Sequence, residues 1–188
     1  MKTEEKIEMC FDVDGFEIKS LKKNAQQILL KNKGVFTYPE NICSIGASAF
    51  LLCHALKEIN TPENIKKIGN GAYSNCSCVK KILTYADEID EWAFNNCFQL
   101  ECAWLMGNLK KLKPYTFSGC NNLRFIFLPD SMQYVEENAF SGCTKLERVY
   151  CTKETTFHEN AFPTKNKNVK KVIRPAVTQK NPKFFLIK

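Results

Sequence analysis

Cysteine is the residue type in this chain that most invites a chemical interpretation. The 188-residue sequence contains 10 cysteines but only two histidines, His54 and His158. Thiols in such number can form disulfides, bind zinc or act as nucleophiles. The sequence has no C-x-x-C pair, and the spacing of Cys76-x-Cys78 does not match the usual zinc knuckle. We therefore expect neither a metal site nor a cofactor.

Catalysis by a cysteine would need a base and an orienting group within hydrogen-bond reach of the thiol. His54 directly follows Cys53 and is expected to point to solvent, and His158 lies far along the chain. The sequence contains no glycine-rich phosphate loop and no H-E-x-x-H motif. The adjacent carboxylates Glu136 and Glu137 occupy a variable position, which is typical of solvated charges. We predict no catalytic residues and no enzymatic activity.

An internal repeat accounts for the cysteines better than metal binding does. A small residue followed by an aromatic recurs, and the aromatics are separated by 23, 21, 23, 23 and 22 residues. These aromatics are Phe50, Tyr73, Phe94, Phe117, Phe140 and Phe162. Three residues after the first five come the cysteines Cys53, Cys76, Cys97, Cys120 and Cys143. Two further apolar columns follow at three-residue steps: first Leu56, Val79, Leu100, Leu123 and Leu146, then Ile59, Ile82, Ala103, Ile126 and Val149.

Each repeat predicts one strand and one tight turn. The run from Leu56 to Pro62 is too short for a helix and is typical of a strand ended by proline. The A-F-x-x-C stretch has the spacing of a tight helical or 3₁₀ turn that buries an aromatic and a thiol. A single coil cannot bury its own apolar residues, whereas stacked coils bury a continuous column. A buried free cysteine then serves as a small apolar residue, and a disulfide ladder is disfavoured by geometry.

Two stretches of the chain resemble a known family. ICSIGASAFLLCHALKEINTPENIKKIG and NNLRFIFLPDSMQYVEENAFSGCTKLERV are similar to the BspA-like leucine-rich repeats of bacterial surface proteins and some protists. The resemblance covers residues 35–163. It implies a repeat solenoid, a curved right-handed leucine-rich-repeat coil with a parallel β-sheet on one face and short turns or 3₁₀ segments on the other. It also implies a protein–protein interaction module, with adhesion or host-surface binding among the roles of relatives.

The chain is expected to divide into three regions. Residues 1–34 lack the repeat and form an N-terminal cap, helical over Ser20 to Leu30. Residues 35–163 hold the repeats, and residues 164–188 hold a degenerate last repeat and a basic segment. Seven strands are expected. The first lies near residues 36–42, and the last, from Val169 to Pro175, matches the run from Leu56 to Pro62 with one residue inserted after Phe162.

Charge is concentrated in the C-terminal segment. Residues 165–188 contain eight Lys or Arg and no acid, which leaves 27 − 8 = 19 basic against 20 acidic residues elsewhere. The repeats therefore have no field that would attract nucleic acid. No apolar run is long enough to span a membrane. Without a signal peptide, and with unpaired cysteines, the chain as given is expected in the cytoplasm, or at the cell surface or secreted if it is a fragment.

The predicted binding surface lies on the outer face of the strands. Side chains alternate across a strand, so the neighbours of the buried column point outward. The pair expected to point outward on the last strand is Lys171 and Ile173. Strand stacking of about 4.8 Å would align four outward apolar residues in a stripe about 15 Å long. The predicted partner-binding residues are Lys81, Leu83, Trp104, Phe125, Phe127, Arg148 and Tyr150.

Alternatives to a free protein-binding surface remain open at this stage. The strand register could be shifted by one residue, or the stripe could be covered by more of a longer protein. The stripe could also be covered by a sister copy in a self-associating surface assembly, although a monomer or weak self-association is expected. A further alternative is binding of an anionic surface by the basic C-terminal segment. The partner itself is not identified by the sequence.

Overall fold

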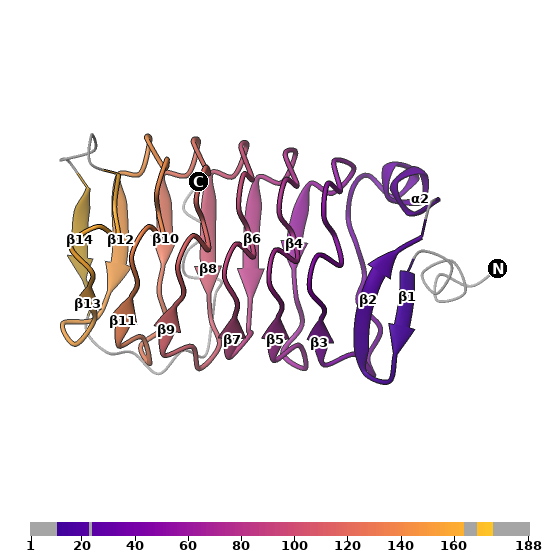
Figure 1. The fold of residues 1–188 in the computed structure, drawn as a ribbon, viewed down its shortest axis with the longest axis horizontal. Coiled ribbons are helices and arrows are strands. Elements are labelled where there is room, and N and C mark those ends of the chain that lie inside the picture. Colours follow the sequence, from indigo (N-terminus) through magenta and orange to yellow (C-terminus); the bar gives the residue numbers. More distant parts are fainter. Residues whose placement is uncertain (1–10, 23, 164–168, 175–188) are drawn as a thin grey trace.

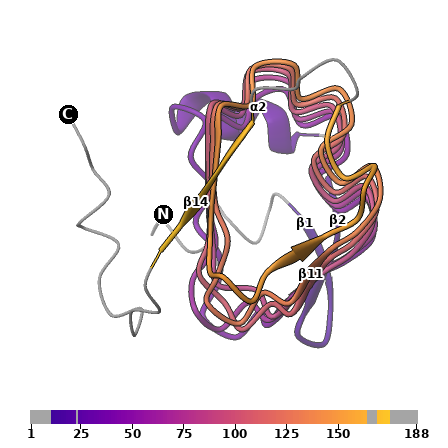
Figure 2. The same cartoon turned by 90° about the vertical axis from the view of Figure 1, so that its left-hand side faces the viewer.

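The main body of the protein is a stack of similar coils (Figure 1). The computed structural model describes residues 11–22, 24–163 and 169–174. One strand from each of six coils joins a parallel sheet with the order β14-β12-β10-β8-β6-β4. Viewed along the stack, successive coils superimpose around a common interior (Figure 2). The predicted repeat solenoid with a parallel sheet along one side is confirmed.

The six strands of this sheet follow the predicted repeat. Their bounds are β4 (Glu58–Asn60), β6 (Lys81–Thr84), β8 (Cys102–Leu105), β10 (Phe125–Phe127), β12 (Arg148–Cys151) and β14 (Lys170–Ile173). The inward residues Ile59, Ile82, Ala103, Ile126 and Val149 lie opposite one another and are all buried. The predicted alternation is therefore confirmed from β4 to β12. Residues 36–42, expected to form a further strand, are not assigned to one, and a single bridge joins Val35 to Glu58.

The predicted register of the last strand is wrong by one residue. Lys170 lies opposite Arg148, and Val172 lies opposite Tyr150. Lys171 and Ile173 therefore occupy the inward columns rather than the outward ones. At this end of the sheet the Lys171 ammonium lies 4.2 Å from the centre of the Phe157 ring. This cation–π contact accounts for a lysine in a column that earlier coils fill with apolar residues.

A second set of strands was not foreseen. Each has two residues and precedes a buried aromatic: β3 (Ser44–Ile45), β5 (Lys67–Ile68), β7 (Glu88–Ile89), β9 (Lys111–Leu112), β11 (Tyr134–Val135) and β13 (Thr156–Phe157). Three of them extend a sheet that starts with β1 (Phe11–Asp14) and β2 (Glu17–Leu21), in the order β1-β2-β3-β5-β7, and the other three form the sheet β13-β11-β9. Two residues are too few for an alternating pattern to be recognised in a sequence.

The first described residues form a hairpin. Strands β1 (Phe11–Asp14) and β2 (Glu17–Leu21) pair antiparallel, and β2 continues in parallel onto β3. The two strands are joined by the two-residue loop Gly15–Phe16, and Gly15, with φ of +61°, was the available signal for this hairpin. Helix α2 (Ala25–Lys31) follows and buries Ala25 and Leu29. None of the helices in the described part of the chain has the length and apolar character needed to cross a membrane.

The interior contains a continuous stack of aromatic rings. Ring centres are 4.8 Å apart for Phe50 and Tyr73, 5.6 Å for Tyr73 and Phe94, and 5.1 Å for Phe94 and Phe117. The stack continues through Phe140 to Phe162. Burying one such side chain contributes about 1.5–3 kcal/mol, so this column supplies a large share of the stability.

The repeat cysteines link each coil to the one before it. All five are buried, and none of them forms a disulfide. The Cys76 thiol donates to the carbonyl oxygen of Phe50 at 3.1 Å, and the Cys120 thiol donates to that of Phe94 at 3.2 Å. Cys97 and Cys143 make the same bond to Tyr73 and Phe117. Cysteine suits this position because it fills a small apolar slot and also supplies a donor to a buried carbonyl.

The A-F-x-x-C stretch forms tight turns and does not continue as a helix. The Cys53 N–H donates to the Phe50 carbonyl at 3.1 Å, the i to i+3 bond expected of a tight turn. Left-handed residues stand on both sides of each aromatic, for example Ser48 and Leu52 around Phe50. Gly119 holds the position two residues after Phe117 that Leu52 holds after Phe50. Its φ is +75°, and a Cβ there would lie 2.1 Å from Asn96 Oδ1. Left-handed residues interrupt a right-handed helical turn, which limits each segment to single turns.

The buried thiols are expected to resist alkylation. Burial raises the pKa of Cys76 and Cys120 well above the usual range, which keeps both thiols protonated at pH 8. Treating the native protein with iodoacetamide at pH 8 should therefore modify exposed Cys43 and leave Cys76 and Cys120 unmodified. Peptide mass mapping measures each site, and the same reaction in denaturant is the control. Equal native rates at Cys43 and Cys120 would contradict this account.

Candidate interaction surface

The outward side chains of the six-stranded sheet form an aromatic stripe. We define the outer aromatic stripe as Leu83, Trp104, Phe127 and Tyr150, which lie opposite one another on β6, β8, β10 and β12. The Trp104 and Phe127 rings stack with centres 5.7 Å apart, and the Phe127 and Tyr150 rings with centres 4.2 Å apart. All four side chains are half-buried. Parallel, in-register pairing causes this arrangement because it places equivalent residues directly above one another.

A second outward column runs beside the stripe. It contains Lys81, Cys102, Phe125 and Arg148 at equivalent positions. The Phe125 ring lies between two guanidinium groups, 4.9 Å from that of Arg124 and 5.7 Å from that of Arg148. Lys81 and Arg148 are exposed. The structure therefore brings all seven residues singled out from the sequence onto one face, and their role in binding a partner stays a prediction.

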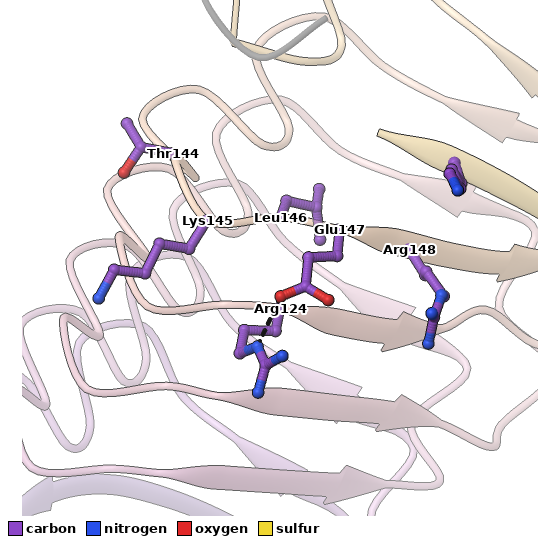
Figure 3. A pocket seen from close by; sticks show the side chains of 7 residues that line it. Arg124, Thr144, Lys145, Leu146, Glu147 and Arg148 are labelled. Carbon is purple, nitrogen blue, oxygen red and sulfur yellow. Dashed lines mark hydrogen bonds and ion pairs between the residues drawn. The ribbon is translucent and has the colours of Figure 1, made fainter. Parts of the chain in front are cut away.

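Arg148 also lines a pocket that the sequence did not reveal. The pocket measures about 380 Å³ and is lined by Arg124, Thr144, Lys145, Leu146, Glu147, Arg148 and Lys170 (Figure 3). Arg124 Nε donates to Glu147 Oε1 at 2.7 Å, and this bond lowers the pKa of the Glu147 carboxyl. Arg148 and Lys170 face each other across β12 and β14. Two like charges at opposed strand positions repel, so a carboxylate or phosphate bound here would relieve that repulsion.

The indole of Trp104 has an unusual environment. Its Nε1 atom is buried and has no hydrogen-bond partner among the residues that the structure describes. Leaving such a donor without an acceptor costs about 1–3 kcal/mol.

A second aromatic pair was missed by sequence reasoning. Trp92 and Tyr115 stack with ring centres 4.1 Å apart, and their φ values are 60° and 57°. They lie in the turns before the buried aromatics, where equivalent positions hold Gly71 and Asn138. In the repeat, Trp92 and Tyr115 align with a glycine and an asparagine, residue types that favour a positive φ, and this alignment could have identified the pair.

The described residues offer little for catalysis or metal binding. Burial raises the pKa of the Cys53 thiol to about 11, so the thiol is not an activated nucleophile. His54 is exposed, and its Nδ1 atom lies 2.8 Å from Ser77 Oγ. Across residues 11–22, 24–163 and 169–174, no three His, Cys, Asp or Glu side chains are grouped so that they could hold a metal ion.

The repeats match a described protein family. A family model for the BspA type leucine rich repeat region matches residues 44–170 in 6 copies. No curated protein sequence matches the chain.

Solved bacterial structures share the fold. A leucine-rich repeat protein from Eubacterium ventriosum is similar at TM-score 0.67 and 24% identity, over 79% of this chain and 39% of its own. A leucine rich cell surface protein from Faecalibacterium prausnitzii is similar at TM-score 0.62 and 26% identity, over 86% of this chain and 45% of its own. The leucine rich repeat protein of T. pallidum is similar at TM-score 0.61 and 24% identity, over 71% of this chain and 62% of its own. The chain thus spans less than two thirds of each of these proteins.

Replacing a phenylalanine by alanine should lower the free energy of unfolding more in the core than on the stripe. Phe94→Ala removes a fully buried ring and should lower the free energy of unfolding by about 3–5 kcal/mol. Phe127→Ala removes a half-buried ring with stacking contacts and should cost about 1 kcal/mol. Urea unfolding followed by circular dichroism measures both. A loss at Phe127 as large as that at Phe94 would assign the stripe to the core.

Proposed function

The chain belongs to the BspA-type leucine-rich repeat family, and from this premise we propose that it is a non-catalytic module that binds a protein partner through its outer aromatic stripe. Leucine-rich repeat proteins are generally protein-interaction modules. The observation that carries the proposal is the in-register stack of Trp104, Phe127 and Tyr150 on the outer face of the six-stranded sheet.

The chemistry of the stripe suits a protein interface. Trp, Tyr and Arg dominate binding hot spots, and Trp104, Tyr150 and Arg148 lie together here. Contiguous apolar side chains on a surface mark interaction sites. The rings already stack on one another, so binding would restrict their motion further by only a small amount. This preorganisation favours affinity without a change in the coils.

The pocket beside the stripe indicates what else the partner carries. Arg124, Lys145, Arg148 and Lys170 line it together with one acid, Glu147, which already pairs with Arg124. A partner that places apolar side chains on the rings and a carboxylate in this pocket would satisfy both features. The cell-surface description of the Faecalibacterium protein supports a surface setting, which for this chain is part of the proposal.

Two tryptophans allow a matched test of the stripe. Trp104→Ala should abolish capture of a partner from lysates of the source organism or its host. Trp92→Ala removes a surface tryptophan that is also stacked on an aromatic, at 38% exposure, and should leave capture unchanged. Affinity capture with mass spectrometry and thermal melting provide the readouts. Capture that survives Trp104→Ala, or is lost equally in both variants, would refute the proposal.

Charge reversal tests the pocket. Arg148→Glu should weaken binding of the captured partner about tenfold or more and reduce its dependence on salt. Lys153→Glu changes the net charge equally at a side chain that is 82% exposed and lies outside the pocket, so it serves as the control. Binding is measured by titration at two salt concentrations. Equal effects of the two variants would exclude a specific role for the pocket.

A further inference from the structure

We infer that the pocket lined by Arg148 recognises a phosphorylated side chain of the partner, carried on an extended segment that also contacts the outer aromatic stripe. This inference rests on the proposed function and names the chemical group that the partner places in the pocket. Three features support it: the charge balance of the pocket, the like charges that face each other there, and the fixed positions of its guanidinium groups.

Cations outnumber acids among the residues that line the pocket. The basic lining residues are Arg124, Lys145, Arg148 and Lys170. Glu147 is the one acid among the lining residues, so the excess is 4 − 1 = 3 positive charges. The Lys145 ammonium donates to the neutral amide oxygen of Asn122 at 2.7 Å, and this bond supplies no negative charge. A carboxylate would cancel one of the three excess charges, whereas a phosphate monoester carries about −1.5 to −2 at pH 7.

Two of these cations face each other across neighbouring strands. Arg148 on β12 lies opposite Lys170 on β14, and such strands are about 4.8 Å apart. At the other end of the same column, Lys81 lies opposite an acid, Glu58. Like charges at opposed positions destabilise a sheet, whereas opposite charges stabilise it. Local conflicts of this kind are expected at functional sites, and a dianion bound between the two cations would remove this one.

The guanidinium groups of the pocket are held in place by neighbouring side chains. The Phe125 ring lies between them, with its centre 4.9 Å from the guanidinium of Arg124 and 5.7 Å from that of Arg148. Arg124 donates to Glu147 through Nε, and this bond leaves its terminal amino groups as donors (Figure 3). Planar guanidinium donors match the oxygens of a phosphate in pairs. The pocket is therefore preorganised for a phosphoryl group.

The position of the pocket beside the stripe indicates a peptide as the carrier of the phosphate. Arg148 and Tyr150 are two residues apart on β12, which places them on one face about 7 Å apart. Side chains two residues apart in an extended peptide have the same spacing and also share a face. A segment along β12 can therefore place a phosphorylated side chain at Arg148 and a bulky apolar side chain on Tyr150. A lipid headgroup would contact the pocket alone.

Three synthetic peptides test this assignment. The first is acetyl-Phe-Ala-pSer-Ala-Phe-amide, which offers a phenylalanine two residues away in either direction, and the others have Asp or Ser in place of phosphoserine. Calorimetric titration at pH 7.5 should show the phosphopeptide binding about tenfold or more tighter than the Asp peptide, and the Ser peptide binding most weakly. Equal affinities for the phosphoserine and Asp peptides, or no binding of the phosphopeptide at about 1 mM, would overturn the inference.

The pH dependence separates a phosphate from a carboxylate. The second pKa of a phosphate monoester is about 6. The lining residues include no histidine, and the hydrogen bond from Arg124 holds the pKa of Glu147 below its usual value, so the ligand is the group that titrates. Lowering the pH from 7.5 to 5 should weaken binding of the phosphopeptide about threefold or more and leave the Asp peptide unchanged, because Asp has a pKa of about 3.9. An equal loss for both peptides would contradict recognition of the dianion.

Replacing one of the opposed cations tests the pocket itself. Lys170→Gln should reduce the preference for phosphoserine over Asp to about threefold or less, and it should raise the melting temperature of the unliganded protein because it removes a repulsion. Lys153→Gln removes the same charge from a side chain that is 82% exposed and lies outside the pocket, and it should change neither quantity. A preference that survives Lys170→Gln, or falls equally in Lys153→Gln, would overturn the inference.

Two more measurements separate the alternatives. Binding to phosphatidylcholine vesicles that contain a phosphoinositide, without binding of the phosphopeptide, would overturn the inference in favour of a lipid headgroup. Tyr150→Ala should weaken all three peptides by the same factor if the stripe takes part. A phosphoserine preference with binding insensitive to Tyr150→Ala, and partner capture insensitive to Trp104→Ala, would refute the proposed function alone. Peptide binding that depends on Tyr150 but not on phosphorylation would refute this inference alone.

Discussion

Every coil of this protein can bury its apolar residues only against the coils before and after it. Equivalent residues therefore lie above one another, so each residue type must pack well against the same type in the next coil. Planar rings meet this condition, as the stack from Phe50 to Phe162 shows. The thiol column meets it as well, because Cys76, Cys97, Cys120 and Cys143 each donate to the aromatic carbonyl of the preceding coil. Stacking thus accounts for five of the ten cysteines of the chain.

The same constraint acts on the outer face of the sheet with a different result. Inside, stacked rings are completely removed from water, and their burial stabilises the coils. Outside, Trp104, Phe127 and Tyr150 stack just as regularly but are only half-buried. A repeat that builds a core automatically builds columns on its surface, and the residue types in those columns decide what they bind. Here aromatic residues and cations lie side by side, and the proposed binding of an apolar partner with an acidic group is based on this arrangement.

Stacking also tolerates local strain. Trp92 and Tyr115 hold left-handed conformations that cost about 1–2 kcal/mol per residue for side chains with a Cβ. The stacking of the two rings, with centres 4.1 Å apart, offsets part of that free-energy cost. The side-chain amide of Asn138, at the equivalent position of the next coil, also donates to the Tyr115 hydroxyl at 3.2 Å.

The sequence by itself determined the repeat, the strands from β4 to β12, the burial of the repeat cysteines and the outward positions from Leu83 to Tyr150. These follow from local periodicity, since a residue's place in the repeat decides which way its side chain points. Only the tertiary structure decided the two-residue strands, the pocket at Arg148 and the register of β14. Each of these depends on contacts between coils: Lys171 points inward because of the rings of Phe157 and Phe162. Such contacts are set by neighbours about 22 residues away or at the end of the stack, where a local pattern carries no information.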